Sequence, residues 1–441
     1  MDRFFSGVYR NRKVIVTGHT GFKGSWLTLW LMRLGAEVTG YSLPPPTVPN
    51  HFELLKPKYT SVIGDIRDRK KVSDVFREHQ PEIVFHMAAL ALVRPSYANP
   101  SETFETNVIG SVNILEACRK TESVRAVINV TSDKCYENNG SIYEYREKDP
   151  MGGHDPYSAS KGCSELVTSS YQRSFFSPDQ YGKTHNTLLA SVRAGNVIGG
   201  GDWQKDRLIP DITKAHVDNA SVIIRNPGAV RPWQHVLEPL SGYLQLGQKL
   251  FQGHRDLSGP WNFGPDGRGL ITVEELVRRA RKIWEGLRYE ILSKTDKPHE
   301  AAFLGLDSSK ARSLLGWQPI WDTEQTLQKT IEWYKKYYLE GCINSEDDLK
   351  QYISDACELK ASWAEPYIAS PRRLPSVPPI EKTTQIKKAR QKYLPGKGEK
   401  TSREKPLCGQ VKFLERMSLQ EKSGFVLNVL SDEAEDVWSE S

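Results

Sequence analysis

Short apolar runs alternate with longer segments of mixed polarity through about the first 200 residues. The runs lie at residues 13–17, 37–41, 60–63, 83–86 and 188–193. Apolar runs of this length predict buried strands, and the segment at 25–31 has the length and apolar spacing of a helix. Strands that alternate with helices favour a parallel sheet covered on both faces. We therefore predict an α/β fold with a doubly wound parallel sheet, followed by a smaller C-terminal lobe and a tail.

A glycine-rich turn, GHTGFKG at residues 18–24, directly follows the first predicted strand. Glycines in such a turn let the backbone approach a pyrophosphate, and the N-terminus of the next helix favours its negative charge. The spacing is GxxGxxG rather than GxGxxG, and a simple tight turn is the alternative interpretation. The position between a strand and a helix favours a Rossmann-type dinucleotide site. The candidate cofactor ligands in this turn are Gly18, Thr20, Gly21, Phe22 and Gly24.

The ends of three later strands bear on the choice of cofactor. Residues 42–44 (SLP) stand where an acidic residue usually binds the adenosine ribose, and no nearby arginine suits a 2′-phosphate. We therefore expect NAD rather than NADP. Asp65, followed by Ile66, could accept a hydrogen bond from the adenine amino group, or it could cap the helix that begins near residue 70. The small side chains of Ala88 and Ala89 would let a dinucleotide lie flat against the strand end.

Two short runs, TSDK and YSASK, carry the candidate chemistry. Tyr157 and Lys161 lie four residues apart, so on a helix they share one face. An amine beside a phenol stabilises the phenolate and lowers its pKa, which makes a base for an alcohol. Asp133 and Lys134, next to Ser132, add a second acid/base pair that simple alcohol oxidation does not need. A surface ion pair is the alternative, but the position after an apolar strand favours a site.

These motifs resemble those of the extended short-chain dehydrogenases/reductases, the NAD-dependent epimerase/dehydratase family, and among them the nucleotide-sugar 4,6-dehydratases that act on CDP-glucose. The resemblance runs from about Phe4 to Ala356. The glycine turn and the YSASK run are shared by many nucleotide-sugar enzymes, whereas Asp133-Lys134 and the RPWQH run are more particular to the dehydratases. It implies a role in deoxysugar and cell-surface polysaccharide biosynthesis, such as that of lipopolysaccharide. The matching stretches are residues 16–24, 131–136, 157–165, 193–203 and 231–236.

The resemblance implies an internal redox cycle that ends in loss of water. Tyr157 would take the proton of the sugar 4-hydroxyl, and Ser132 would share the hydrogen bond to O4. Lys161 would hold the phenolate and bond the nicotinamide ribose. Lys134 would remove the proton at C5, and Asp133 would protonate the departing 6-hydroxyl, which gives a 4-keto-6-deoxy sugar. Which of Asp133 and Lys134 is the acid and which is the base stays open.

The resemblance places most substrate ligands in the second half of the chain. Asn196 resembles a residue whose amide contacts the sugar diphosphate. Arg207 and Arg231 suit a diphosphate because a guanidinium pairs phosphate oxygens bidentately, although either could instead be solvated or paired with a carboxylate. His235 could contact the base or simply pack, and Arg94 would reach the substrate from the segment that follows Ala88 and Ala89. The loop GGGDW at residues 199–203 is expected to be flexible and to close on the nucleotide.

The chain is expected to have three regions. Residues 1–190 form a dinucleotide-binding domain to which later segments return, 191–356 form mainly a nucleotide-sugar lobe, and 357–441 form a basic linker and a tail of unknown role. Residues 371–405 have 11 Lys or Arg against 3 Asp or Glu, whereas residues 406–441 have 3 against 7. The net charge of +6 therefore belongs mainly to the linker. This favours a solvated, disordered tether, and no binding of nucleic acid is expected.

Cysteine usage and hydropathy bear on the compartment. None of the six cysteines has the spacing of a metal site, which favours reduced thiols in a cytoplasmic protein without a metal. The start of the chain shows no signal peptide, and no apolar run approaches the roughly 18 residues of a spanning helix, so no membrane insertion is expected. Similar proteins dimerise through helices near residues 108–110 and 157, so a homodimer or a dimer of dimers is expected.

Other functions stay open at this point. A nucleotide-sugar 4-epimerase would share Tyr157 and Lys161 but would not need Asp133 and Lys134, and a dehydratase of another nucleotide sugar would share all four. A non-catalytic scaffold that acts through its tail belongs to a different class, and the intact set of Ser132, Tyr157 and Lys161 argues against it. No side chain identifies cytosine from first principles, so CDP depends on the resemblance.

Overall fold

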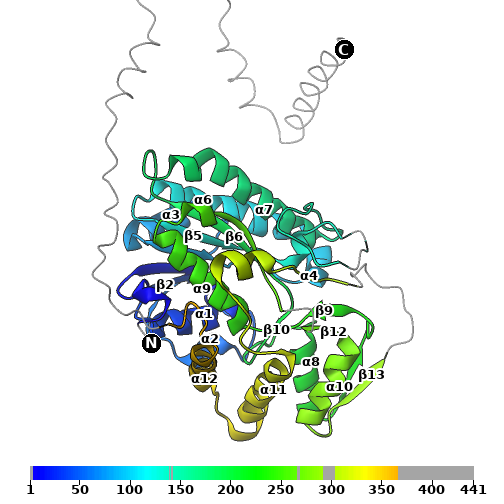
Figure 1. The fold of residues 1–441 in the computed structure, drawn as a ribbon. Coiled ribbons are helices and arrows are strands. Elements are labelled where there is room, and N and C mark those ends of the chain that lie inside the picture. The colour runs from blue at the N-terminus through cyan, green and yellow to red at the C-terminus, as the bar shows by residue number, and fades with distance from the viewer. Residues whose placement is uncertain (1–2, 139, 141–142, 266–268, 292–302, 366–441) are drawn as a thin grey trace, which may run out of the picture. The chain divides into compact units, whose positions relative to one another are not determined.

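A seven-stranded parallel sheet forms the centre of the structure, a computed structural model that describes residues 3–138, 140, 143–265, 269–291 and 303–365 (Figure 1). Its strands are β1 (Lys13–Thr17), β2 (Glu37–Ser42), β3 (Thr60–Ile63), β4 (Ile83–His86), β5 (Ala126–Val130), β6 (Leu188–Ala194) and β11 (Gly259–Phe263). The strand order is β11-β6-β5-β4-β1-β2-β3, and every neighbouring pair is parallel. This confirms the doubly wound parallel sheet predicted from the sequence.

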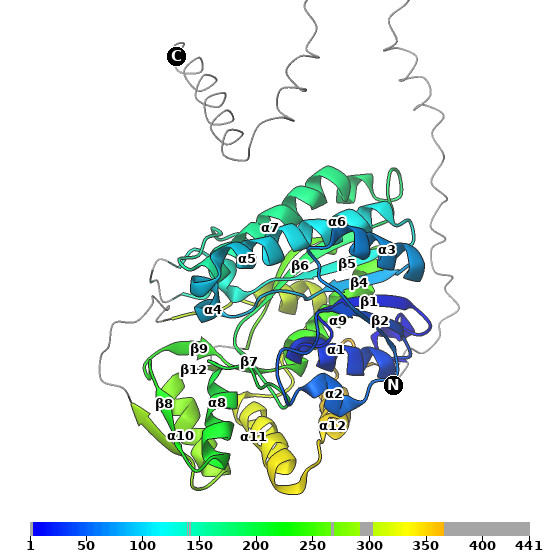
Figure 2. The same cartoon turned by 180° about the vertical axis from the view of Figure 1, so that it is seen from behind.

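Helices cover both faces of the sheet (Figures 1 and 2). They are α1 (Phe22–Arg33), α3 (Arg69–His79), α6 (Gly110–Lys120), α7 (Pro156–Phe175) and α9 (Leu237–Phe251). Val14 and Val16 of β1 pack in one core with residues of α1 and α9. Ile15, between them, packs in a second core with residues of α3 and α6. Successive side chains of a strand point to opposite faces, so a strand buried on both faces is apolar without a break.

The order in which strands are added reverses between β1 and β4. Strands β2 and β3 extend the sheet on one side of β1, and β4, β5 and β6 extend it on the other side. Thr17, the last residue of β1, lies opposite Tyr41 of β2 and His86 of β4. Open α/β sheets bind their ligands outside the carboxyl ends of the strands at such a reversal. The glycine turn and residues 87–89, which follow β1 and β4, therefore flank the expected ligand position.

The smaller lobe follows β6 and has its own apolar core. Its strands form three short pairs, β7 with β10, β9 with β12 and β8 with β13, and Ile212, Leu276 and Ile331 from three of its helices meet in the core. The lobe contains β7 (Val197–Ile198), α8 (Leu208–Val217), β8 (Ser221–Ile224), β9 (Val230–Pro232), β10 (Gln234–His235), β12 (Leu270–Thr272), α10 (Val273–Ile283), β13 (Arg288–Ile291) and α11 (Thr323–Glu340). The remaining α-helices are α2 (His51–Leu55), α4 (Val93–Ala98), α5 (Pro100–Phe104) and α12 (Ser345–Glu358).

All described residues belong to one compact unit. The boundaries expected at residues 190 and 356 stay predictions, and the expected tail lies almost wholly outside the described residues. Over the described part of the chain, no helix is long and apolar enough to cross a bilayer. In the same part, no group of three or more His, Cys, Asp or Glu side chains could hold a metal ion, and the five cysteines are free thiols.

Candidate functional site

The glycine turn packs its backbone directly against the end of β4. Gly18 has a φ of +76°, and a Cβ at this position would lie 2.8 Å from the backbone nitrogen of Ala88. A Cβ on Gly24 would lie 2.1 Å from the Gly18 carbonyl oxygen. Gly21 precedes α1, and the first N–H groups of a helix have no partner within it. The turn thus offers a close, positively polarised cradle of the kind that a pyrophosphate fills.

The side chains of Thr20 and Phe22 support the turn from within the fold. The Thr20 hydroxyl lies 2.9 Å from the Ser42 hydroxyl and donates to the Leu43 carbonyl, also at 2.9 Å, which ties the turn to the end of β2. The Phe22 ring lies against Gly199, where a Cβ would be 3.4 Å from the ring. Both residues therefore position the turn, and their backbone faces the edge of the sheet at which a cofactor is expected.

Asp65 has a partner in its own loop rather than in the following helix. Its carboxylate accepts hydrogen bonds from Arg67 Nε at 2.9 Å and Nη2 at 2.7 Å, and the hydrogen bonds from Arg67 hold the pKa of Asp65 below its usual range. The N-cap of α3 is Asp68, which accepts from the Lys71 N–H. The alternative that Asp65 caps this helix is therefore wrong. Ile66 is buried, and its side chain packs against Gly110.

The TSDK and YSASK runs meet at the ends of β5 and α7. The Ser132 hydroxyl donates to Asp133 Oδ1 at 3.0 Å, accepts from the Lys134 N–H at 3.2 Å, and is hydrogen-bonded to Tyr157. Ser132, Asp133, Tyr157 and Lys161 are all buried, and Lys134 is half-buried. Lys161 Nζ donates to the carbonyl of Val130 at 3.3 Å. The structure therefore joins a phenol, a hydroxyl and a carboxyl group into one hydrogen-bonded chain.

The electrostatics of Tyr157 differ from the expectation. Burial raises the pKa of its phenol to about 12, and the hydrogen bond with Ser132 offsets only part of this rise. The stabilisation of the phenolate by the Lys161 amine stays a prediction. Burial lowers the pKa of Lys161 itself to about 8, and its amine is turned to the Val130 carbonyl.

Two residues near this chain were not among the predicted site residues. Lys23 belongs to the glycine turn, and burial together with the charges of Arg207 and Lys161 lowers the pKa of Lys23 to about 7 against an opposing effect of Asp133. Its Nζ lies 5.8 Å from the ring centroid of Tyr243, a buried residue of α9. Lys23 could have been found from its place in the turn. Tyr243 lies in an apolar helix and belongs to no sequence motif that would have indicated a site residue.

The predicted substrate arginines take different positions. Arg207 is half-buried, pairs with Asp202 Oδ2 at 3.2 Å, and acts electrostatically on Tyr157, so it lies near the catalytic residues. Arg231 is buried and donates to the Val230 carbonyl at 2.9 Å. Arg94 is exposed and pairs with Asp206 at 3.3 Å. Carboxylate pairing, the alternative considered for Arg207, is thus present, and the roles of all three in substrate binding stay predictions.

Asn196 and His235 differ in accessibility. Asn196 is half-buried just after β6, and its carbonyl accepts from the Gln234 N–H at 3.1 Å. His235 is 1% exposed and packs edge-on against Trp26 and Trp321, with ring centroids 5.9 and 4.8 Å away. Burial lowers the pKa of His235 to about 3, so the ring is neutral. This packing favours the alternative that His235 simply packs, and its contact with the substrate stays a prediction.

The loop at residues 199–203 is packed rather than free to close. A Cβ on Gly200 would lie 2.0 Å from the Trp333 indole, and one on Gly201 would lie 2.6 Å from the His51 ring. The Gly200 carbonyl accepts from Trp26 Nε1 at 2.9 Å. The glycines thus serve close packing under aromatic rings, and the expectation of a flexible loop is wrong.

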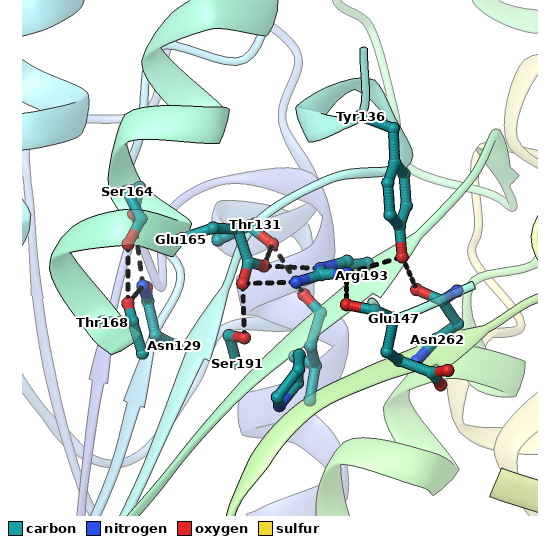
Figure 3. A network of polar contacts seen from close by, with 12 residues as sticks. Asn129, Thr131, Tyr136, Glu147, Ser164, Glu165, Thr168, Ser191, Arg193 and Asn262 are labelled. Carbon is teal, nitrogen blue, oxygen red and sulfur yellow. Dashed lines mark hydrogen bonds and ion pairs between the residues drawn. The ribbon is translucent and has the colours of Figure 1, made fainter. Parts of the chain in front are cut away.

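Figure 3 shows a buried polar network that supports the TSDK run from behind. Arg193 Nε and Nη2 donate to the two carboxylate oxygens of Glu165 at 2.9 and 2.8 Å. The hydroxyls of Ser191 and Thr131 donate to the same carboxylate. Arg193 Nη1 donates to the Tyr136 hydroxyl at 2.6 Å. Because Thr131 begins the TSDK run and Glu165 lies on α7, the network fixes the two catalytic segments to each other.

The parallel sheet, the glycine turn at its reversal point and the Tyr–x₃–Lys pair together define a nucleotide-dependent short-chain dehydrogenase or a relative of one. In agreement, residues 14–257 match the model of the NAD dependent epimerase/dehydratase family, and the chain belongs to that family. It is 51% identical over 352 residues to CDP-glucose 4,6-dehydratase of Salmonella typhimurium, which covers 79% of this chain and 96% of that protein.

More distant relatives share the fold. The chain is 26% identical to dTDP-glucose 4,6-dehydratase of Neisseria meningitidis, with 77% of this chain and 98% of that protein covered. UDP-glucose 4-epimerase of Thermotoga maritima, solved with UDP-glucose, superposes with a TM-score of 0.63 at 23% identity, over 74% of this chain and 99% of that chain. dTDP-glucose 4,6-dehydratase of Bacillus anthracis, solved with NAD, gives 0.60 at 21% identity, over 74% and 97%. These two structures support the fold alone.

Proposed function

We propose that this protein is a CDP-glucose 4,6-dehydratase, which converts CDP-D-glucose into CDP-4-dehydro-6-deoxy-D-glucose and water with NAD as its cofactor. The observation that carries the proposal is the hydrogen-bonded chain from Tyr157 through Ser132 to Asp133. An epimerase needs the phenol and the hydroxyl, but a carboxyl group joined to them adds the acid that loss of a hydroxyl group requires. The 51% identity to the Salmonella enzyme supports CDP-glucose as the substrate.

The cradle at the sheet edge fits the proposed cofactor. Gly18, Gly21 and Gly24 would hold the pyrophosphate, Ala88 and Ala89 would flank the dinucleotide, and Lys161 would bond the nicotinamide ribose. Asp65 and Ile66 stay the proposed neighbours of the adenine. When bound, NAD would supply the hydride chemistry, from C4 and back to C6, and its positive ring would favour the phenolate form of Tyr157.

The side chains of the site then divide the proton transfers among them. Tyr157 takes the proton of the 4-hydroxyl, and Ser132 holds O4. Lys134 removes the proton at C5, which the 4-ketone has made acidic, and Asp133 gives its proton to O6 as the C6–O6 bond breaks and water leaves. Lys134 later returns its proton to C5. Arg207, Arg231 and Asn196 stay the proposed ligands of the sugar diphosphate, and Arg94 a further substrate contact.

The proton balance of this sequence gives the hydrogen-bonded chain a role. At the end of a turnover Tyr157 holds one proton more than at the start, and Asp133 holds one fewer. Ser132 is hydrogen-bonded to both, so its hydroxyl can accept the proton of Tyr157 and pass its own to Asp133. This transfer restores both groups without a proton from solvent. The proton lost by the 4-hydroxyl is then in effect the one that supplies the next molecule of water.

The oligomeric state and the location in the cell are also proposals. A homodimer or a dimer of dimers through α6 and α7 is supported by exposed apolar side chains, since Ile109, just before α6, is 53% exposed and Leu166 of α7 is 61% exposed. A cytoplasmic location is supported by five free cysteines among the described residues.

The proposal is tested by incubating the purified protein and NAD with CDP-, dTDP-, GDP- and UDP-hexoses and identifying the products by mass and NMR. Loss of one water from CDP-glucose, with a 4-keto-6-deoxy product, is the expected result. Water loss from another nucleotide sugar alone would mean that this sugar, rather than CDP-glucose, is the substrate. An isomerised sugar of unchanged mass would mean that the protein is a 4-epimerase. Untouched sugars in every case would overturn the enzymatic proposal and favour a scaffold. Tyr157→Phe is the matched inactive control, because it keeps the ring and removes the base.

A further inference from the structure

Two buried oxygen atoms near the catalytic residues lack hydrogen-bond partners among the described residues. They are Oδ2 of Asp133, whose Oδ1 is held by Ser132, and the hydroxyl of Tyr243. Asp133 is 2% exposed and Tyr243 is fully buried. Buried polar atoms nearly always have a partner, so two unpartnered oxygens close to a reaction centre point to a polar group of the substrate.

The fold aims the Tyr243 phenol at the carboxyl edge of the sheet. α9 packs on β5 and β6 (Figure 1) and begins at that edge, where the Val236 N–H bonds the Ile198 carbonyl at 2.8 Å. Side chains of a helix lean toward its N-terminus, so the phenol extends from the second turn of α9 toward the edge. There its ring meets Phe263, the last residue of β11, edge to face with centroids 5.7 Å apart.

Ionisable groups of the site lie near this phenol. Lys23 Nζ lies 5.8 Å from the ring centroid. Burial, followed by the charges of Asp133 and Tyr157, raises the pKa of Tyr243 well above its ordinary range. The phenol therefore keeps its proton at any pH at which the enzyme works. It is a buried hydrogen-bond donor without an acceptor among the described residues, and Asp133 lies near enough to act on it electrostatically.

We propose that Tyr243 and Asp133 form the binding site for the 6-hydroxyl of the hexose, the group that leaves as water. A hydroxyl group suits both oxygens, because it can accept the phenolic hydrogen and hold a second hydrogen bond with the carboxyl group. This inference rests on the proposed function and adds a substrate-contacting residue to it. In the elimination step the C6–O6 bond breaks, Asp133 transfers its proton to O6, and Lys134 holds the proton from C5. Tyr243 keeps its own proton and stabilises the charge that develops on O6.

Binding of two ligands that differ only at C6 tests the inference without turnover. Calorimetry with NADH in place of NAD prevents oxidation of the sugar, and the ligands are CDP-glucose and CDP-6-deoxyglucose. Wild-type protein should bind CDP-glucose more tightly. Tyr243→Phe should weaken the binding of CDP-glucose by about 10-fold, the effect of one buried hydrogen bond. The same substitution should change the binding of CDP-6-deoxyglucose by less than about 2-fold, because no hydrogen bond is lost there.

Tyr9→Phe is the matched control. The Tyr9 hydroxyl is also buried and donates to the Leu244 carbonyl of the same helix at 2.6 Å. Its loss should affect both ligands equally. If Tyr243→Phe weakens both ligands to the same extent or neither of them, the phenol does not contact the 6-hydroxyl and the inference is overturned. If wild-type protein binds neither CDP-sugar, the proposed function is itself contradicted, and the inference falls with it. This outcome differs from the one that contradicts the inference alone, so the two failures are distinguishable.

Discussion

The Glu165→Gln substitution should strongly destabilise the protein, because it removes one charge from a buried ion pair. The side chains of Glu165 and Arg193 are 5% and 3% exposed. Burial raises the pKa of Glu165, but the charge of Arg193 and the hydrogen bonds from Arg193, Ser191 and Thr131 outweigh burial and hold this pKa below its usual range. The carboxylate is therefore charged in the folded protein and compensates the guanidinium.

The size of the effect follows from the contacts. Each carboxylate oxygen accepts two hydrogen bonds, one from Arg193 and one from the Ser191 or Thr131 hydroxyl. The amide nitrogen of glutamine cannot accept, so in either orientation one of the two bonds from Arg193 is lost, whereas the Ser191 or Thr131 hydroxyl can turn and accept from the amide. Arg193 also keeps a buried charge without its counter-ion. Breaking a buried ion pair in this way costs about 3–5 kcal/mol, a large share of a total stability of about 5–15 kcal/mol.

Urea unfolding followed by tryptophan fluorescence measures this loss as a shift in midpoint at constant slope. The matched control is Glu116→Gln, which removes a carboxylate from a more exposed pair with Arg119, with side chains 18% and 38% exposed. That change should cost no more than about 1 kcal/mol. Adding Arg193→Met to Glu165→Gln removes the uncompensated charge and should recover part of the loss. The buried charge does not control stability here if Glu165→Gln lowers the free energy of unfolding no more than Glu116→Gln does. The same conclusion follows if adding Arg193→Met lowers the free energy of unfolding further.

Two further predictions concern pH and the second acid/base pair. Burial raises the pKa of Glu238 from 4.5 to about 7, although hydrogen bonds from the Trp321 and Ile320 N–H groups and from Tyr352 oppose the rise. Between these two pH values the folded protein holds a proton that the unfolded chain releases. The free energy of unfolding therefore falls as the pH rises from 4.5 to 7. Glu238→Gln should therefore gain about 3 kcal/mol in free energy of unfolding relative to wild type across that window, and an unchanged difference at pH 4.5 and 7.5 would contradict the assignment. Lys134→Ala should lower the rate of water loss by about 100-fold or more, while single-turnover absorbance still shows reduced cofactor from oxidation at C4; full dehydratase turnover would exclude Lys134 as the base.

The parts of this protein that could be predicted from the sequence are those governed by local pattern. Five strands were found within a residue or two of their observed bounds, because a strand buried on both faces is apolar without interruption. The glycine turn was found because close backbone contact excludes any Cβ at Gly18 and Gly24. The TSDK and YSASK runs were found because chemistry at a strand end and at a helix start is carried by neighbouring residues.

What could not be predicted depends on contacts between distant segments. His235 and the glycine loop at residues 199–203 have polar or flexible composition, yet Trp26 of α1 packs against His235 and Trp333 of α11 packs against Gly200. Tyr243 shows the opposite case, because it is a phenol in an apolar helix and its buried hydroxyl has no partner among the described residues. Residue type and spacing define which groups could react, but only the packing of α9 against β5 and β6 decides which of them face the substrate. A site residue on a helix that covers one face of such a sheet, as α9 does here, is therefore found from an unpartnered polar atom in the fold rather than from a motif.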